Sequence, residues 1–346
     1  GHVFPGLNLA EHLNNLNYDV ELVTDKRGYL FLSELDNFKI KILPSSPFKR
    51  QNIFSFISSF IFILYSILRS TIFLIFNRPK IIFGMGGYAS FPICFAATIL
   101  RIKFIIYENN LIIGRSNKWL LPYAEKIFVS HKELIGIDKK FDHKIVKIGN
   151  IIKKSIINFT RIKTTKFSKK LSILILGGSQ AAKIFGETLP SIFRRCSKEG
   201  IALKVFQHCL PHQEKELSMF YKKADIEFET FSFSNDLTEY FSKVNFAITR
   251  SGASVLAELT NANIPFISIP LPSSADNHQF INAIFYQRKK LAFLVEEKDL
   301  KEELFKLIKK IYSNDQLLGE IINNQRQYSD KNVYKYINED LDKVFR

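Results

Sequence analysis

Three glycine-containing loops are the first features of this sequence that could do chemistry. They read GMGGYAS over residues 84–90, GGSQAAK over 177–183 and RSGAS over 250–254. Each follows an apolar run typical of a strand and precedes a helical pattern. Glycine lets the backbone approach an anion closely, and the unpaired amides at a helix start favour negative charge. A single loop of this kind is more often a plain turn, but three together, with Glu258 after the last, indicate a nucleotide ligand.

The kind of nucleotide is narrowed by motifs that the sequence lacks. It has no GxxxxGK[ST] loop, which disfavours P-loop hydrolysis of ATP or GTP, and no GxGxxG. The strand after the second glycine loop ends in Gln207-His208 rather than in an acidic residue that would hold an adenosine ribose. Cys94, Cys196 and Cys209 lie far apart, so neither a disulfide scaffold nor a zinc site is expected. We predict no metal or other cofactor.

Strands and helices must position these loops, and the sequence supplies both in alternation. Apolar runs without polar alternation, such as SILIL and PFISI, are typical of parallel strands buried on both faces. The runs expected to be strands are residues 20–24, 81–83, 104–107, 126–130, 145–148, 171–176, 203–207, 226–230, 246–249 and 266–269. The predicted fold class is α/β, with two doubly wound sheets. Their boundary is expected after Gly149-Asn150, before a Lys-rich stretch from Lys153 to Lys170.

Residues 53–76 form one nearly continuous apolar stretch, close to the roughly 20 residues that cross a bilayer. Its polar members fall within one narrow arc of a helix, with Thr71 alone outside it; they are Ser55, Ser58, Ser59, Ser66, Arg69 and Ser70. Arg69 would be costly at a bilayer centre, and Pro79 ends the helix. We expect one side to pack on a protein core and another to enter a membrane interface. A wholly buried helix and a spanning helix are the alternatives.

The chain of 346 residues is long enough for two domains and strongly basic. Lys and Arg number 49 against 33 Asp and Glu, a formal charge of +16. This excess favours a polyanionic partner such as nucleic acid, an acidic membrane or a phosphorylated substrate, although a general drift toward Lys explains it equally well. Basic residues that flank the apolar helix suit anionic headgroups; they are Lys49, Arg50, Arg78 and Lys80.

Seven segments, taken together, resemble the MurG family, the undecaprenyl-diphospho-muramoylpentapeptide β-N-acetylglucosaminyltransferases. In the family's order and spacing they are GHVFPGLNLAEHL, FGMGGYASFP, YENNLIIGRSNKWL, the GN of residues 149–150, LILGGSQAAK, RSGASVLAEL and DNHQFINA. The resemblance covers essentially the whole chain, and the combination of GMGGY, EN…SNK, GGSQ and RSGA…E is specific.

The resemblance implies a GT-B glycosyltransferase with two facing Rossmann-like domains and a cleft between them. Residues 1–152 would form the acceptor and membrane-binding domain, with the final helix of residues 331–346 packing back on it. Residues 153–330 would bind the UDP-sugar. The implied reaction transfers N-acetylglucosamine from UDP-N-acetylglucosamine to the 4-hydroxyl of undecaprenyl-linked muramoyl-pentapeptide, with inversion. The implied place is the cytoplasmic face of the cell inner membrane, as a peripheral protein of peptidoglycan synthesis that serves cell shape and division.

The donor contacts follow from the resemblance and from the chemistry of the matched residues. The diphosphate is assigned to Ser179, Gln180 and the loop Arg250-Ser251-Gly252, which start helices. Glu258 is expected to accept the ribose hydroxyls, because a carboxylate is a suitable bidentate acceptor. The uracil is assigned to Phe233 and Ser234, and the sugar to Asn110, Gln279 and Asn282. From their spacing alone, Gln279 and Asn282 would be an exposed helix face.

The acceptor contacts and the general base are assigned to the first half of the chain. His2 is the first candidate for the base, because imidazole titrates near neutral pH, and Glu108 is its rival. Either could instead orient the acceptor, and a His beside a turn is more often structural. The resemblance assigns Gly86, Gly87 and Tyr88 to the acceptor side, where loop amides could receive the lipid diphosphate.

Several positions depart from the family pattern. The glycine-rich strand and loop that end in GGTGGH are represented only by Gly1-His2, so we expect a chain truncated at its start, without a signal peptide. GGSQGAR is here GGSQAAK, with Ala181 and Lys183, and Lys153 replaces an Arg. Lys keeps the charge but loses the planar fork of Arg, which could weaken donor binding. Ser234 is also less apolar than the usual uracil neighbour.

Two other function classes stay open. Another UDP-sugar transferase or an epimerase of the same fold would share the loops of the second half but would not accept a lipid-linked muramoyl substrate. A basic nucleic-acid-binding protein would need Lys and Arg on one face with interleaved aromatic residues. The clearest aromatic cluster is instead the helix of residues 53–76, so no nucleic-acid partner is expected.

Overall fold

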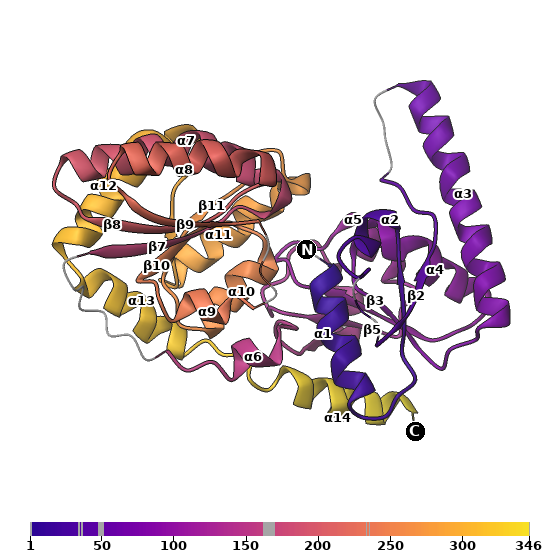
Figure 1. The fold of residues 1–346 in the computed structure, drawn as a ribbon. Helices are drawn as coiled ribbons and strands as arrows, with labels where there is room; N and C mark the ends of the chain where they lie inside the picture. The colour runs from indigo at the N-terminus through magenta and orange to yellow at the C-terminus, as the bar shows by residue number, and fades with distance from the viewer. Residues whose placement is uncertain are drawn as a thin grey trace. The chain divides into compact units, whose positions relative to one another are not determined.

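The computed structural model describes residues 2–33, 35, 37–47, 52–161, 170–232, 234 and 236–345, with the backbone alone for residues 178–182 and 345. The described chain divides into two compact units. Unit 1 comprises residues 1–152 and 332–346, and unit 2 comprises residues 153–331. Each contains parallel β-sheet covered by helices (Figure 1).

Unit 1 contains a four-stranded parallel sheet in the order β3-β4-β5-β6 and a separate parallel pair, β1-β2. The strands are β1 (Glu21–Thr24), β2 (Lys39–Ile42), β3 (Ile82–Gly84), β4 (Phe104–Glu108), β5 (Lys126–Val129) and β6 (Ile145–Lys147). The helices are α1 (Val3–Asn14), α2 (Lys26–Tyr29), α3 (Ile53–Phe76), α4 (Gly87–Ile99), α5 (Arg115–Leu120), η1 (Lys139–Lys144) and α14 (Val333–Phe345). The buried core includes Cys94, Phe104 and Ile127, which are fully shielded from solvent.

Helix α14 is held to unit 1 by hydrogen bonds, an ion pair and a ring contact. The Tyr334 hydroxyl donates to the Ile152 carbonyl at 2.7 Å, and its ring centroid lies 4.4 Å from that of His12. Lys126 Nζ lies 2.6 Å from Asp340 Oδ1. The end of the chain therefore completes the unit in which the chain begins.

Helix α3 has the bounds expected from the sequence, but only a small part of its surface is buried. It packs on α4, and its buried residues are Ser66, Ser70 and Leu74. The Ser66 and Ser70 hydroxyls donate to carbonyls one turn earlier, at 2.7 and 2.8 Å, which allows these two serines to face protein. The opposite side exposes large apolar residues to solvent, so the alternative of a wholly buried helix is wrong. By length and composition α3 could also cross a membrane.

Unit 2 is one six-stranded parallel sheet in the order β9-β8-β7-β10-β11-β12. Its strands are β7 (Leu171–Leu176), β8 (Leu203–His208), β9 (Glu227–Phe231), β10 (Phe246–Arg250), β11 (Phe266–Ile269) and β12 (Phe293–Leu294). Numbered from the first strand of the unit, this order is 3-2-1-4-5-6, that of a Rossmann fold. The chain changes direction along the sheet between β7 and β10, where ligands bind in folds of this class.

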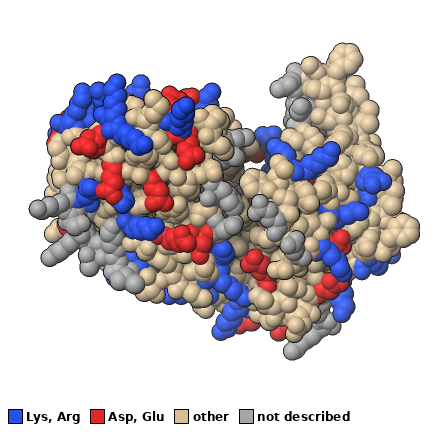
Figure 2. Space-filling view, viewed as in Figure 1, with Lys and Arg blue, Asp and Glu red and all other residues tan. Residues whose placement is uncertain are grey.

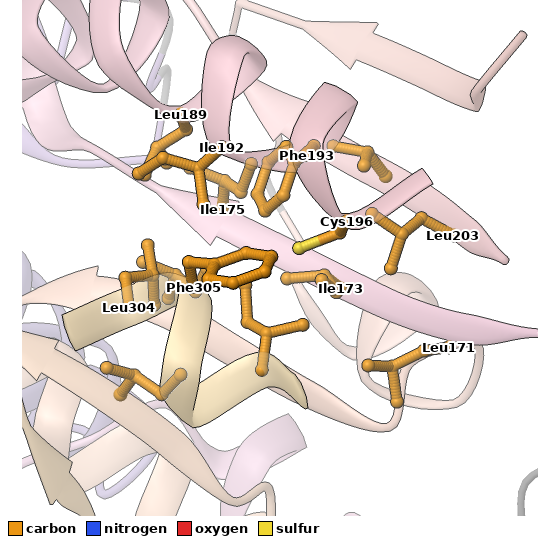
Figure 3. Close-up of a cluster of buried hydrophobic side chains, with 14 of the residues drawn as sticks. Leu171, Ile173, Ile175, Leu189, Ile192, Phe193, Cys196, Leu203, Leu304 and Phe305 are labelled. Carbon is orange, nitrogen blue, oxygen red and sulfur yellow. The ribbon is translucent and has the colours of Figure 1, made fainter. Parts of the chain in front are cut away.

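The helices of unit 2 cover its sheet (Figure 1). They are α6 (Lys154–Ile157), α7 (Gly178–Lys198), η2 (Pro211–Gln213), α8 (Glu214–Lys223), α9 (Thr238–Phe241), α10 (Ala253–Asn261), η3 (Ala275–Asn277), α11 (His278–Arg288), η4 (Glu297–Asp299), α12 (Leu300–Ser313) and α13 (Gln316–Arg326). Phe193 and Cys196 of α7 lie among Ile173 and Ile175 of β7, with Phe305 of α12 beside them (Figure 3).

The strands agree closely with the sequence prediction, except that two of them were not predicted. The predicted strands are all present, and each end falls within one residue of its expected position. Two strands were missed, β2 and β12. β2 reads KIKI and is largely exposed, and β12 has two residues, so neither forms the long apolar run that identifies a buried parallel strand.

Candidate functional site

Two of the glycine loops lie side by side at the direction change of the unit 2 sheet. β7 and β10 are parallel neighbours, with Phe246 beside Ile173 and Thr249 beside Leu176. β7 leads through Gly177 into α7, and β10 leads through Ser251 and Gly252 into α10. Because the carboxyl ends of parallel strands meet at one edge of the sheet, both helix starts open at this edge. The arrangement suits the diphosphate of a nucleotide.

Ser251 is held in place by several hydrogen bonds to neighbouring elements. Its amide donates to Gln279 Oε1 at 3.2 Å, and its carbonyl accepts from Asn282 Nδ2 at 3.2 Å. Its hydroxyl bonds to that of Ser268 at 2.7 Å. Gln279 Oε1 also accepts from the Leu271 amide at 3.0 Å. The predicted sugar ligands Gln279 and Asn282 therefore fix the loop that begins α10.

Asn282 is almost completely buried, at 1% exposure, so the interpretation of Gln279 and Asn282 as an exposed helix face is wrong. Gln279 is partly exposed and stands at the start of α11. The two residues before this helix, Asp276 and Asn277, have positive φ values of 49° and 55°. Asn and Asp tolerate this left-handed backbone better than most residues, and it turns the chain sharply into α11.

Arg250 is buried beneath the same loop. Its Nη1 atom donates to the carbonyls of Ile269 and Pro270, at 3.3 and 3.2 Å, and its Nη2 atom lies 2.5 Å from Glu297 Oε2. Its guanidinium also lies against the ring of Phe185. The contacts of Arg250 with the protein therefore account for both of its terminal nitrogens, and a direct contact with the diphosphate stays a prediction.

Glu258 lies on α10, beyond the loop, and faces the positive charge of Lys153. Although the residue keeps some exposed surface, burial raises the pKa of its carboxyl to about 7, and Lys153 opposes this rise. The Glu258 carboxyl therefore titrates near neutral pH. A hydrogen bond donated to this carboxylate would favour its charged form.

The segment after β9 supplies a second acidic group near Lys153. The Ser234 hydroxyl donates to the Asp236 carbonyl at 3.1 Å, and Asp236 Oδ1 accepts from the amide and the hydroxyl of Thr238. Burial raises the pKa of the Asp236 carboxyl, whereas the hydrogen bonds from Thr238 and the charge of Lys153 lower it. The lowering effects are together the larger, so the pKa lies below its ordinary value. The predicted ligand Phe233 and the side chains of Ser179 and Gln180 lie outside the described residues.

In unit 1 the structure brings His2 against the first glycine loop. Gly86 and Gly87 both have positive φ, 91° and 70°. A Cβ at Gly86 would lie 3.1 Å from His2 Cε1 and Nδ1, and a Cβ at Gly87 would lie 3.0 Å from His2 Cδ2. Both the backbone conformation and the approach of the imidazole therefore require glycine. Tyr88, the next residue, packs under Arg27, whose guanidinium carbon lies 5.0 Å from the ring centroid.

The carboxylate of Glu108 is occupied by the loop that follows β4. Its Oε1 atom accepts from the amide and the side chain of Asn110, at 3.1 and 2.9 Å. Its Oε2 atom accepts from the Gly114 amide at 2.8 Å and from Asn117 Nδ2 at 2.9 Å. The residue is 2% exposed. This arrangement is that of a residue that shapes a loop, because all four hydrogen bonds come from the segment that follows β4.

Three residues that contact the predicted site residues were not predicted from the sequence. Asn117 and Arg27 were not singled out, although Asn117 lies in the segment YENNLIIGRSNKWL, and Glu297 carried no signal at all.

A D-x-D spacing, which elsewhere can hold a metal-nucleotide, occurs at Asp340-Leu341-Asp342. It lies within α14, where Asp340 pairs with Lys126. Within the described residues no group of three or more His, Cys, Asp or Glu could hold a metal ion.

The chain is similar over nearly its whole length to curated transferases. The relative in Pelagibacter ubique (strain HTCC1062), a UDP-N-acetylglucosamine–N-acetylmuramyl-(pentapeptide) pyrophosphoryl-undecaprenol N-acetylglucosamine transferase, is 34% identical over 98% of this chain and 94% of its own length. The protein of the same name in Rickettsia canadensis (strain McKiel) is 32% identical over 94% of this chain and 91% of its own. The structure of Acinetobacter baumannii MurG matches with a TM-score of 0.76 at 23% identity, over 99% of this chain and 96% of that one.

Two Rossmann-like domains, with helix starts gathered at the direction change of one sheet, give the chain the GT-B fold, and two family models make it a glycosyltransferase. The glycosyltransferase family 28 N-terminal domain matches residues 1–129, and the family 28 C-terminal domain matches residues 172–339. The chain belongs to the MurG family within glycosyltransferase family 28.

Proposed function

We propose that this chain transfers N-acetylglucosamine from UDP-N-acetylglucosamine to the 4-hydroxyl of lipid-linked N-acetylmuramoyl-pentapeptide. The reaction converts lipid I to lipid II in peptidoglycan synthesis and releases UDP. The names of the relatives support this substrate pair. The observation that carries the proposal is the adjacency of β7 and β10, which opens two helix starts at one edge of the sheet, with Glu258 on the second helix.

In the proposed complex the donor is bound by unit 2. The amides at the starts of α7 and α10 carry partial positive charge and would hold the diphosphate, with Lys153 adding a full charge. Glu258 would accept the ribose hydroxyls, and the segment around Ser234 would contact the uracil. Gln279 and Asn282 would position Ser251, and Gln279, which is partly exposed, would also meet the sugar.

The proposed chemistry is a single displacement with inversion. The acceptor oxygen forms a bond to the anomeric carbon while the bond from that carbon to the UDP oxygen breaks. The acceptor hydroxyl proton passes to a base, and the negative charge passes to the departing diphosphate. His2 is the proposed base, because the Glu108 carboxylate already accepts four hydrogen bonds. Gly86, Gly87 and Tyr88 would contact the acceptor beside His2, and Asn110 would contact the transferred sugar.

We propose that the transfer needs no metal ion. The leaving diphosphate would be stabilised by the helix starts and Lys153, which perform the role that a divalent cation has in other nucleotide-sugar transferases. A chelator such as EDTA should therefore leave the rate unchanged. Loss of activity in EDTA, with recovery on adding Mg²⁺ or Mn²⁺, would contradict this part of the proposal.

We propose that unit 1 docks through α3 on the anionic cytoplasmic leaflet, where the lipid acceptor is made available. The N-terminal half of α3 exposes Phe54, Phe56 and Phe60. Figure 2 shows a nearly uncharged surface over α3, with Lys and Arg on the neighbouring surface. Arg78 and Lys80 follow the helix, and Lys41 lies 5.7 Å from the Phe73 ring centroid. An apolar helix with basic residues near one end suits the headgroup region of an anionic membrane.

Thermal unfolding with and without the donor tests the donor site directly. Any ligand that binds the native state alone stabilises it, by about 2.7 kcal/mol at a hundredfold excess over Kd. UDP-N-acetylglucosamine should raise the melting temperature, and ATP and NAD should not. No stabilisation by the donor, or equal stabilisation by ATP, would contradict the donor assignment. Another UDP-sugar transferase or an epimerase is not favoured, because the two curated relatives described above, at 34% and 32% identity, are transferases of one name.

A further inference from the structure

Glu297 and Arg250 form an ion pair beneath the loop that opens α10. Arg250 Nη2 lies 2.5 Å from Glu297 Oε2, and the two side chains are only 8% and 22% exposed. Arg250 Nη1 donates to the carbonyls of Ile269 and Pro270. The guanidinium carbon lies 4.9 Å from the centroid of the Phe185 ring, which is completely buried. Arg250 is therefore held by four partners at once.

The partners of Arg250 come from different parts of the donor side. Phe185 belongs to α7, the helix that begins within the GGSQ segment. Ile269 ends β11, and Glu297 begins η4, after β12. Arg250 itself is the last residue of β10 and is bonded directly to Ser251. The guanidinium thus links the start of α10 to three neighbouring elements along the sheet.

We propose that Glu297 is a positioning residue for donor binding, which acts through Arg250. This inference rests on the proposed function, because it assigns the donor diphosphate to the amides at the start of α10. Glu297 neutralises the buried guanidinium and fixes its direction, and Arg250 in turn fixes the backbone of Ser251 and Gly252. The amides of α10 are then held where the diphosphate binds, without reorganisation when the donor arrives.

A buried charge that loses its partner is strongly unfavourable, so Arg250 would reorient toward solvent if Glu297 lost its charge. Ser251 would follow, because it is the next residue in the chain. The loop would nevertheless stay attached, since Gln279, Asn282 and Ser268 bind Ser251 independently. Removal of the Glu297 charge should therefore weaken donor binding without unfolding unit 2.

The neighbouring residue Glu296 provides a matched control. Its carboxylate lies 3.2 Å from Lys298 Nζ, in a pair whose side chains are 42% and 70% exposed. Pairs of this kind contribute little to stability because solvent screens them. Glu296→Gln removes the same charge from the adjacent position, and it leaves the pair of Glu297 and Arg250 in place.

The test compares Glu297→Gln, Glu297→Asp and Glu296→Gln in the full chain, well below each melting temperature. Calorimetry gives the Kd for UDP, and steady-state transfer gives a KM for UDP-N-acetylglucosamine and another for a muramoyl-pentapeptide lipid analogue. We expect Glu297→Gln to raise both the UDP Kd and the donor KM about tenfold. This change is larger than the loss of an exposed ion pair would cause, and smaller than the roughly hundredfold loss on full displacement of a positioning group. The acceptor KM should not change. Glu297→Asp should recover part of the affinity, and Glu296→Gln should match the unmodified chain.

A merely structural role for Glu297 would give a different result. Glu297→Gln would then lower the melting temperature and the active fraction, but the folded protein would keep its UDP Kd and donor KM, and this outcome would overturn the inference. If Glu297→Gln does not fold, Glu297→Asp provides the same readouts, because the shorter side chain keeps the charge but draws the carboxylate away from Arg250 Nη2. An unmodified chain that fails to bind UDP would instead contradict the proposed function.

Discussion

The imidazole of His2 lies directly against Gly86, so closely that a Cβ on Gly86 would stand 3.1 Å from two of its ring atoms. Gly86 has φ 91° and ψ −178°, a combination that is essentially restricted to glycine. The same residue precedes the first turn of α4, whose amides are proposed to receive the acceptor diphosphate. One glycine therefore couples the proposed base to the proposed acceptor loop.

The first prediction concerns this glycine. Gly86→Ala should lower kcat/KM for the lipid acceptor by about tenfold to a hundredfold, because the new methyl group displaces His2 or the loop. The backbone strain should also lower the free energy of unfolding by about 1–3 kcal/mol. The Kd for UDP, measured by calorimetry, should stay unchanged because the donor is assigned to unit 2.

Gly200 is a suitable control for the strain alone. It has φ 81°, and a Cβ there would meet no heavy atom within 4 Å. Gly200→Ala should therefore lower the melting temperature and leave the acceptor kinetics of the folded protein unchanged. The account of Gly86 would be wrong if both variants had the same kinetic effect.

A second prediction separates His2 from Glu108. His2→Gln should reduce kcat about a hundredfold to ten-thousandfold, as expected for the loss of a general base, with little change in melting temperature. Glu108→Gln places an amide group opposite donors such as the Gly114 amide and Asn117 Nδ2. Unpaired donors should lower its free energy of unfolding by about 1–3 kcal/mol.

The two variants are compared by single-turnover transfer and by thermal unfolding of the same preparations. The assignment of the base would be reversed if His2→Gln kept its full rate while Glu108→Gln lost the rate without losing stability.

The third prediction follows from the raised pKa of Glu258, about 7. Affinity for UDP-N-acetylglucosamine should increase as the pH rises through 7, because the ionised carboxylate is the better acceptor for the ribose hydroxyls. The diphosphate of this donor is esterified at both ends, so it has no ionisation of its own near neutral pH. In Glu258→Gln, calorimetric titrations between pH 6 and 8 should give a weaker affinity with little pH dependence.

The same group makes a prediction about stability. Its pKa is higher in the native state than the ordinary value of 4.5, so the native state binds more protons between these two values. The contribution of Glu258 to stability is therefore present below pH 4.5 and is lost as the pH rises toward 7, with a slope of at most about 1.4 kcal/mol per pH unit. As the pH rises from 4.5 to 7, the melting temperature of Glu258→Gln should therefore increase relative to that of the unmodified chain. A constant difference would contradict the raised pKa.

A fourth prediction concerns α3. Replacing Phe54, Phe56 and Phe60 together by Ser should strongly reduce binding to vesicles that contain phosphatidylglycerol, because each buried aromatic side chain contributes about 1.5–3 kcal/mol. Met219→Ser on α8, at 64% exposure in unit 2, is the control for loss of an exposed apolar residue. The electrostatic contribution of Lys and Arg to vesicle binding is measured by two further sedimentation assays. One uses vesicles of phosphatidylcholine alone, and the other uses raised salt. Unchanged binding of the triple variant would argue against α3 as the docking element.

The sequence predicted the strands well because parallel strands buried on both faces are continuous apolar runs. SILIL lies within β7 and FISI forms β11. The same rule fails for β2, whose Lys residues alternate with Ile because the strand is largely exposed. Helix α3 was also identified, and two members of its predicted polar arc, Ser66 and Ser70, are buried with their hydroxyls bonded within the helix.

The residues around Ser251 could not be placed from the sequence alone. Gln279 and Asn282 have the spacing of an exposed helix face, and only the fold brings Asn282 to the Ser251 carbonyl. Glu297 is far from Arg250 in the sequence and near it only because β10, β11 and β12 lie side by side. Contacts across a sheet depend on strand order, which local sequence patterns do not specify.

The most direct test of the central claim is transfer of radiolabelled N-acetylglucosamine from UDP-N-acetylglucosamine to a soluble muramoyl-pentapeptide lipid analogue. The assay uses the full chain, with Glu258→Ala in parallel. We predict a labelled disaccharide product with a β-1,4 bond, formed in proportion to the UDP released, and a large loss of product at limiting donor for Glu258→Ala. A chain that binds UDP-N-acetylglucosamine yet labels no muramoyl acceptor, or that acts equally well with Glu258→Ala, would contradict the account.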